Sequence, residues 1–276
     1  MGSRLLSGLV RLCAGAVSLG TIGVITGLCG LSDSRALAQV GLNPMVIQSE
    51  VTRGQAQSVI TVTNPSREPM RVRVYAEPFT YDRVNGFVLL DEDSNDLTPY
   101  LQFSPREFVI PPDEAQRVRV VGLLPPSLEE TEYRAVIFTE ALPENAEGAS
   151  GVAGIQTRIG STVYFRQPDS APVFSIVQAQ WDSEEEQAQL LVSNAGKATA
   201  RPNATWTIQR DGTPIATGQS GATTVMEGGD RLIPLPYLSE AQTALPPGEY
   251  EVVGELTWFF DQEQSSQSFS APLNVQ

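Results

Sequence analysis

Carboxylates are the only plentiful side chains in this sequence that could do chemistry. The 276 residues include 32 Asp and Glu, no histidine, one lysine (Lys197) and two cysteines, Cys13 and Cys29. Both cysteines lie in an N-terminal segment that we expect to be removed. Without histidine or a retained thiol, Ser-His-Asp and Cys-His catalysis, histidine metal sites and thiolate zinc sites are excluded. Lys197 follows a glycine and is expected in an exposed turn.

The densest acidic cluster, residues 91–96, superficially resembles the beginning of a calcium-binding loop. Such a loop needs a glycine at its sixth position and a bidentate glutamate at its twelfth. Asp96 and Gln102 take those two places. We therefore interpret the cluster as a solvated acidic loop, with calcium binding as the alternative.

No other carboxylates are arranged for catalysis. Glu184-Glu185-Glu186 is interpreted as a charged hairpin turn. No pair of Asp or Glu is visible that could serve as general acid and base. We expect no enzymatic activity, no cofactor and no small-molecule substrate.

The first 38 residues are typical of a secretory signal. Arg4 and Arg11 precede an apolar stretch, residues 12–31, and Ala36-Leu37-Ala38 matches a small-residue cleavage pattern. We expect cleavage after Ala38.

Two alternatives to cleavage stay open. The uncharged run 12–32 approaches the roughly 20 residues that span a bilayer, so the segment could be retained as an anchor, although its five glycines weaken that interpretation. Lipidation at Cys29 is a third option, disfavoured because Leu28 stands where bacterial lipid attachment favours a small residue.

The charge of the chain excludes two classes of partner. The full sequence carries a formal charge of −14, and the signal holds three arginines and one aspartate, so its removal leaves −16. Nucleic acid and anionic lipid heads are normally bound by clustered Lys and Arg. We expect neither as a partner.

The pattern of the remaining chain predicts an all-β protein. Helical periodicity is nearly absent, and 20 prolines and 23 glycines separate short alternating segments, as in β-sandwiches. Strands are predicted first at 45–51, 57–64, 70–77, 86–90, 106–110, 116–122, 132–140 and 153–166, and then at 173–180, 187–193, 204–209, 213–217, 232–235, 250–258 and 269–275.

The two sets of strands predict two immunoglobulin-like β-sandwich domains in tandem after a cleaved signal peptide. The first is expected over 39–166 and the second over 173–276. Between them, residues 167–172 are polar and bracketed by prolines. We expect this segment to be a semi-rigid hinge.

The last strand of the first domain, 152–166, is the strongest binding candidate. Its residues alternate between two faces, with Ala153, Ile155, Thr157 and Ile159 on one of them. If the edge of this strand is open, its backbone can pair with a strand of another protein. The alternative is that these side chains only fill the core of the domain.

Several segments of the first domain follow a distinctive order. They are Asn64-Pro65-Ser66-Arg67-Glu68-Pro69, Phe103-Ser104-Pro105-Arg106, Phe108-Val109-Ile110-Pro111-Pro112, Gln116-Arg117-Val118-Arg119-Val120, Leu124-Pro125, Glu132-Tyr133-Arg134-Ala135, Gln156-Thr157-Arg158-Ile159 and Val163-Tyr164-Phe165-Arg166. In order and spacing, residues 44–166 resemble the periplasmic pilus assembly chaperones of the PapD type. Residues 173–276 match only as a generic immunoglobulin-like sandwich.

The resemblance implies a periplasmic protein that binds incomplete immunoglobulin-like pilus or surface subunits. It would lend the edge strand 152–166 to complete their fold and prevent their aggregation before assembly. It also implies an outer-membrane assembly platform as a partner. The apolar positions that face a subunit in the family correspond here to Ala153, Ile155 and Thr157, of which only Ile155 is bulky.

The family also holds the terminal carboxylate of the subunit, with an arginine on the first strand and a lysine on the last. The matching positions here are Ser49 and Thr162, whose hydroxyls can donate hydrogen bonds without a cation's charge. Arg158 lies on the same face as Thr162 at a distance of about 13 Å. Arg53, in the turn after the first strand, is the other nearby cation.

A function of a different class remains as the alternative. The chain could be a structural or adhesive module of the cell envelope that kept the chaperone fold without chaperone activity.

Overall fold

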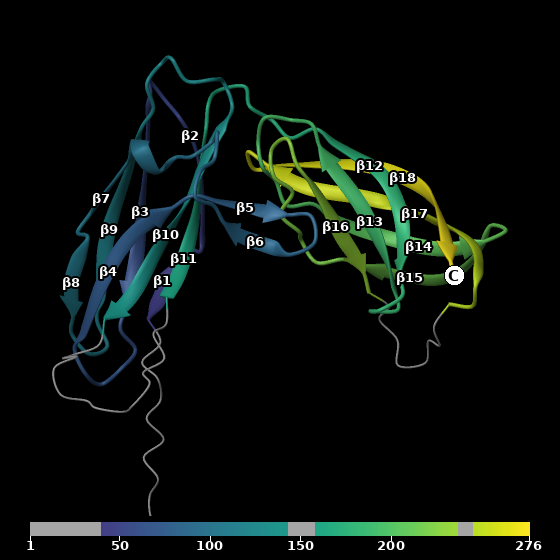
Figure 1. Ribbon diagram of the computed structural model, residues 1–276, viewed down its shortest axis with the longest axis horizontal. Coiled ribbons are helices and arrows are strands. Elements are labelled where there is room, and N and C mark those ends of the chain that lie inside the picture. The colour runs from purple at the N-terminus through teal and green to yellow at the C-terminus, as the bar shows by residue number, and fades with distance from the viewer. Residues whose placement is uncertain (1–39, 143–157, 237–244) are drawn as a thin grey trace, which may run out of the picture. The chain divides into compact units, whose positions relative to one another are not determined.

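The computed structural model describes residues 40–142, 158–236 and 245–276, and Figure 1 shows its strands. Within these residues the only helix is a single 3-10 turn, η1 (Thr98–Tyr100). The strands build two consecutive β-sandwiches, which lie on either side of the predicted hinge. The predicted all-β class with two immunoglobulin-like sandwiches is confirmed.

One sheet of the first sandwich has four strands in the order β1-β3-β9-β7. They are β1 (Gly41–Asn43), β3 (Gln55–Thr63), β9 (Ala115–Leu123) and β7 (Leu101–Ser104). β3 and β9 pair over their full length. Because their residues alternate, Ile60, Val62, Val118 and Val120 are buried in the core while their neighbours face away from it.

The opposing sheet has five strands in the order β2-β11-β10-β4-β8. They are β2 (Val46–Glu50), β11 (Arg158–Arg166), β10 (Glu132–Leu142), β4 (Met70–Glu77) and β8 (Glu107–Ile110). The strand predicted at 45–51 is β2, which pairs with β11, and β1 is an additional strand before it, which pairs with β3 in the first sheet. Pro44 lies between them, so the chain changes sheets there.

A separate hairpin follows β4. It consists of β5 (Phe79–Asp82) and β6 (Gly86–Leu89), and Gly86 has a φ of +77°, which glycine adopts without strain. Phe79 is fully buried and packs edge-to-face on Tyr164 of β11, with ring centroids 5.8 Å apart. The hairpin therefore covers the face of β11 that points away from the first core.

The second sandwich has one sheet of three strands and one of four. The first has the order β12-β13-β16, and the second has the order β15-β14-β17-β18. Their bounds are β12 (Phe174–Asp182), β13 (Gln187–Asn194), β14 (Asn203–Arg210), β15 (Thr213–Gln219), β16 (Asp230–Leu235), β17 (Gly248–Phe260) and β18 (Glu263–Val275). The predicted turn at Glu184-Glu185-Glu186 lies between β12 and β13, and Lys197 is exposed in a bend, both as expected.

Each sandwich is organised around its own apolar core. Val72, Ile110 and Phe165 belong to the first, and Leu190, Trp206 and Leu256 to the second. Fully burying one such side chain contributes about 1.5–3 kcal/mol. Packing of these two cores is the main source of stability in the two sandwiches.

Candidate functional site

The candidate site is the edge of β11, which is paired unequally on its two sides. All nine residues of β11 pair with β10 in antiparallel register. On the other side, only Thr162–Arg166 pair with β2, in parallel register. Among the strands that the structure describes, none pairs with residues 158–161 on that side.

Two hydrogen bonds mark where the pairing with β2 begins. The backbone N–H of Thr162 donates to the carbonyl of Met45 at 3.0 Å, and the hydroxyl of Ser161 donates to the carbonyl of Pro44 at 2.6 Å. Backbone groups of alternate residues in a strand point to the same side. The N–H and C=O groups of Gly160 and Arg158 therefore point to the side of β2, beyond the point where β2 begins.

The side chains of β11 also separate into two faces. Val163 and Phe165 are fully buried in the first core, and Ile159 packs against the same core while remaining partly exposed. Arg158 lies on the opposite face. Its guanidinium is centred 4.3 Å from the ring of Phe138 and donates a hydrogen bond to the hydroxyl of Tyr75 at 3.1 Å.

Close packing against β10 leaves room only for glycine at position 160. A Cβ added there would lie 2.6 Å from Cγ2 of Val136 and 3.1 Å from a ring carbon of Phe138. Both neighbours are on β10, so a larger residue would force the face of the sheet apart. The unpaired stretch consequently has no side chain between Arg158 and Thr162 on this face.

Three of the predicted contact positions, Ala153, Ile155 and Thr157, lie outside the described residues. Their role as apolar contacts stays a prediction. Ile159, the fourth, lies on the core face of β11, at the border of the core.

The structure does not bring the predicted hydroxyl pair together. Ser49 pairs with Phe165, and Thr162 pairs with Val46. Since residues paired in a sheet share a face, Ser49 lies on the core face and Thr162 on the other. Thr162 is also 93% buried, being 7% exposed, and its hydroxyl contacts the carbonyl of Met45 at 3.5 Å.

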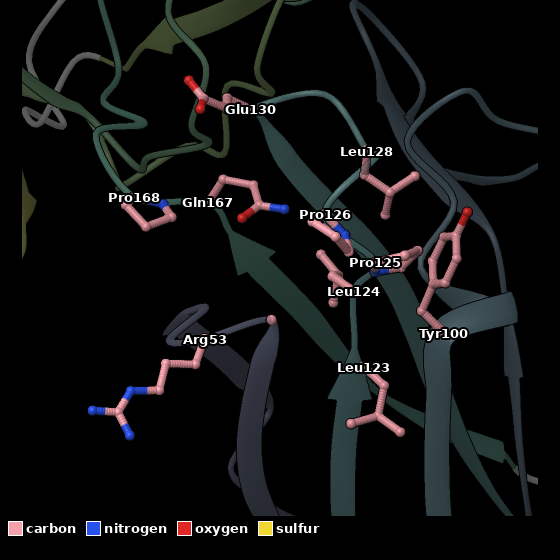
Figure 2. Close-up of a pocket in the computed structure, with 11 residues that line it drawn as sticks. Arg53, Tyr100, Leu123, Leu124, Pro125, Pro126, Leu128, Glu130, Gln167 and Pro168 are labelled. Carbon is pink, nitrogen blue, oxygen red and sulfur yellow. The ribbon is translucent and has the colours of Figure 1, made fainter.

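Arg53 lies in the turn between β2 and β3, where it lines a pocket of about 810 Å3. Figure 2 shows Arg53 on one side of this pocket and mainly apolar residues on the other. The wall residues are Tyr100, Leu123, Leu124, Pro125, Pro126 and Leu128. All five residues of β2 separate Arg53 from the unpaired stretch of β11. Among the four predicted anchoring positions, Arg158 alone lies on that stretch.

The acidic cluster 91–96 contributes to a buried ion-pair network that the sequence did not reveal. Arg134 lies 2.8 Å from the carboxylate of Asp93 and 3.1 Å from that of Glu227. The side chains of Arg134 and Asp93 are each only 8% exposed. The interpretation of the cluster as solvated is therefore wrong for Asp93. Among the described residues, no group of three or more His, Cys, Asp or Glu could hold a metal ion.

A second buried carboxylate, Glu132, begins β10. It is 1% exposed, and its Oε2 accepts a hydrogen bond from the backbone N–H of Thr199 at 3.1 Å. Burial raises the pKa of Glu132 to about 7, while the bond from Thr199 opposes the shift. The shifted pKa makes the stability of the protein depend on pH.

Among the described residues, no helix has the length and hydropathy of a membrane-spanning segment.

Comparisons with known proteins give a match only at the level of structure. A scan against protein-family models and a search of curated proteins found no match. Among solved structures, the class 5 fimbriae chaperone CfaA is similar, with a TM-score of 0.52 and 9% identity over 84% of this chain and 99% of that one.

A second similar structure is a chaperone–tip adhesion subunit pre-assembly complex, CsuC-CsuE, from archaic chaperone-usher Csu pili of Acinetobacter baumannii. The TM-score is 0.50, with 12% identity over 87% of this chain and 100% of that one. The predicted resemblance to pilus chaperones is thus confirmed at the level of the fold.

Proposed function

We propose that the protein is a periplasmic chaperone that binds incomplete immunoglobulin-like subunits through the edge of strand 152–166. Pairing with this edge keeps a pilus or surface subunit from aggregating before assembly. The proposal includes export and cleavage after Ala38. The observation that carries it is the stretch 158–161 of β11, which pairs with β10 but not with β2.

The physical basis is the chemistry of an incomplete sandwich. A subunit that lacks one strand exposes both an apolar groove and a row of unpaired backbone groups, which makes it prone to aggregate. One added strand satisfies both, because its backbone completes the sheet and its side chains enter the groove. A rigid donor strand serves best, and the described part of this one is fixed along β10 by nine residue pairs.

Arg158 is the cation best placed to face such a subunit. Its side chain is 42% exposed, lies 3.8 Å from the carboxylate of Glu77 and is held against Phe138. An exposed ion pair at that distance contributes at most about 1 kcal/mol. Arg158 is therefore free to bind a carboxylate of the subunit at small cost.

The test is site-specific crosslinking in the cell envelope from a photoreactive residue at position 155, followed by identification of the trapped protein. The expected partner is a protein whose own sandwich lacks a strand. In the protein without the probe, Ile155→Asp should abolish co-purification of that partner, because a carboxylate cannot enter an apolar groove unpaired.

A matched probe at Ile215 provides the control. Ile215 is 43% exposed and belongs to β15 in the second sandwich, which does not pair with the donor strand. Capture at 215 but not at 155 would contradict the proposal. Presence of the protein in mature surface assemblies, with unchanged subunit levels after its deletion, would favour a structural or adhesive module instead.

A further inference from the structure

The four-stranded sheet of the first sandwich has an unusual composition for so acidic a chain. The sequence contains 32 Asp and Glu in 276 residues. None occurs in β1, β3, β9 or β7. The face of this sheet that points away from the core is therefore free of negative charge.

Three arginines occupy the same region. Arg117 and Arg119 are exposed on β9, and their neighbours across β3 are Thr61 and Val59. Arg106 follows β7, with its guanidinium centred 4.8 Å from the ring of Phe103. In the described part of the chain, none of the three forms an ion pair. We call these three residues, with the outward residues of β3, β9 and β7, the arginine face.

The surroundings of these arginines leave them accessible. Arg119 donates one hydrogen bond to the side-chain oxygen of Gln57 at 2.8 Å, which leaves most of its donors open. Two hollows of about 330 and 730 Å3 meet at Arg119 and Ser104. The first also contains Arg117, and the second Arg106. Arg119 lines both hollows, so a ligand in either of them meets Arg119 together with Arg117 or Arg106.

We propose that the arginine face docks an acidic, extended segment of a second protein partner. Arg117 and Arg119 point to one side of β9 and are two residues, or about 7 Å, apart. Acidic side chains at alternating positions of an extended peptide repeat at the same spacing. Carboxylates at such positions can each pair with one guanidinium. Val59, which is 45% exposed, offers an apolar contact beside them.

A polypeptide segment fits this face better than a polyanionic surface does. The chain as a whole carries a charge of −14, which opposes approach to a membrane or nucleic acid over a large area. Charges are screened beyond about 8 Å at physiological ionic strength. A short segment therefore experiences mainly the local arginines.

The arginine face and the β11 edge belong to opposite sheets of the sandwich. Both can be occupied at once, so this inference does not depend on the proposed subunit binding. Failure of one leaves the other intact.

The experiment measures binding of the full mature protein to a fluorescent peptide with two alternating glutamates, Thr-Glu-Val-Glu-Thr-Gly. A peptide of the same composition with adjacent glutamates tests the spacing. Arg117→Gln with Arg119→Gln removes two positive charges from the face. Arg67→Gln with Arg71→Gln removes the same charge from exposed positions elsewhere.

The alternating peptide should bind saturably and more tightly than its isomer. The Arg117/Arg119 variant should lose about tenfold in affinity, the equivalent of about 1.4 kcal/mol, while the Arg67/Arg71 variant stays within about twofold. Arg117→Glu with Arg119→Glu should instead bind the peptide in which lysines replace the glutamates. No saturable binding, equal loss in both pairs of variants, or binding of phosphatidylserine vesicles in place of the peptide would overturn the inference.

Discussion

Asn64 and Asn194 make the same set of hydrogen bonds in the two sandwiches. Each accepts a bond at 3.0 Å from the backbone N–H two residues later, of Ser66 and Gly196 respectively. Each donates to the carbonyl four residues later, at 2.7 and 2.8 Å. Each also donates to a carbonyl far along the chain, that of Ile110 at the end of β8 (3.0 Å) and that of Val225 between β15 and β16 (3.3 Å). Both side chains thus tie the turn that they begin to a distant part of the chain.

Asn64→Ala and Asn194→Ala should each destabilise the protein by about 2–4 kcal/mol, because several buried backbone groups lose their partners at once. Urea unfolding measures the effect. Asn274→Ala, at an exposed position of β18, serves as the control and should change the free energy of unfolding by less than about 0.5 kcal/mol. Equal effects at Asn64 and Asn274 would refute this role.

The sequence predicts most of the strands of the fold, but not all of them. Alternation predicted most strands because a half-buried strand repeats every two residues. It failed where burial does not alternate. β18 begins at Glu263, but residues 263–268 are exposed and polar, and only pairing with β17 extends the strand to them. β7 is four residues long, too short to produce a pattern.

Arg134→Met should cost about 3–5 kcal/mol, since it leaves the carboxylates of Asp93 and Glu227 buried without their shared cation. Arg71→Met is the matched control. Its ion pair with Glu107 joins side chains that are 59% and 45% exposed, so its loss should cost less than about 1 kcal/mol. Thermal and urea unfolding of both variants compare the two, and similar losses would refute a structural role for the Arg134 network.

Glu132 should make stability depend on pH. Because its pKa in the folded protein is raised from 4.5 to about 7, the folded state retains a proton that the unfolded state has released. The resulting stabilisation is present below pH 4.5 and is lost as the pH rises to about 7. Its size is on the order of 2–3 kcal/mol.

Glu132→Gln should remove this contribution. Urea unfolding of both proteins at several values between pH 4.5 and pH 7 measures it. The difference between them should change steadily across the window. A constant difference would mean that Glu132 does not titrate there.

The candidate site was only partly accessible from the sequence. Alternation within one segment predicts the strand 152–166, and the structure describes residues 158–166 of it as β11, but which strands lie beside it is not predictable from that pattern. The predicted anchoring role of Ser49 required it to lie on the same face of the sheet as Thr162. The chain changes sheets at Pro44, and this change determines the face on which Ser49 lies. Contacts such as Glu132 with Thr199, 67 residues apart, leave no local signal.

Arg158→Pro should distinguish the contribution of the β11 backbone to subunit binding from the contribution of the side chains. Its N–H points away from β10, so proline removes only a group on the unpaired edge, where proline is tolerated. The affinity for the subunit should fall by about tenfold or more. The free energy of unfolding should change by less than it does when proline replaces a residue in the interior of a strand. Arg158→Ala keeps the N–H and should retain more of the binding. Equal loss in the two variants would assign the effect to the guanidinium alone.

Residue-resolved amide hydrogen exchange in the free protein tests the open edge most directly. The amides of Thr162 and Tyr164, which face β2, should exchange slowly, as should those of Ile159 and Ser161, which face β10. The amides of Arg158 and Gly160 should exchange much faster and should become protected when a captured subunit is bound. Slow exchange of Gly160 in the free protein would show that its edge is already covered and would contradict the proposed function.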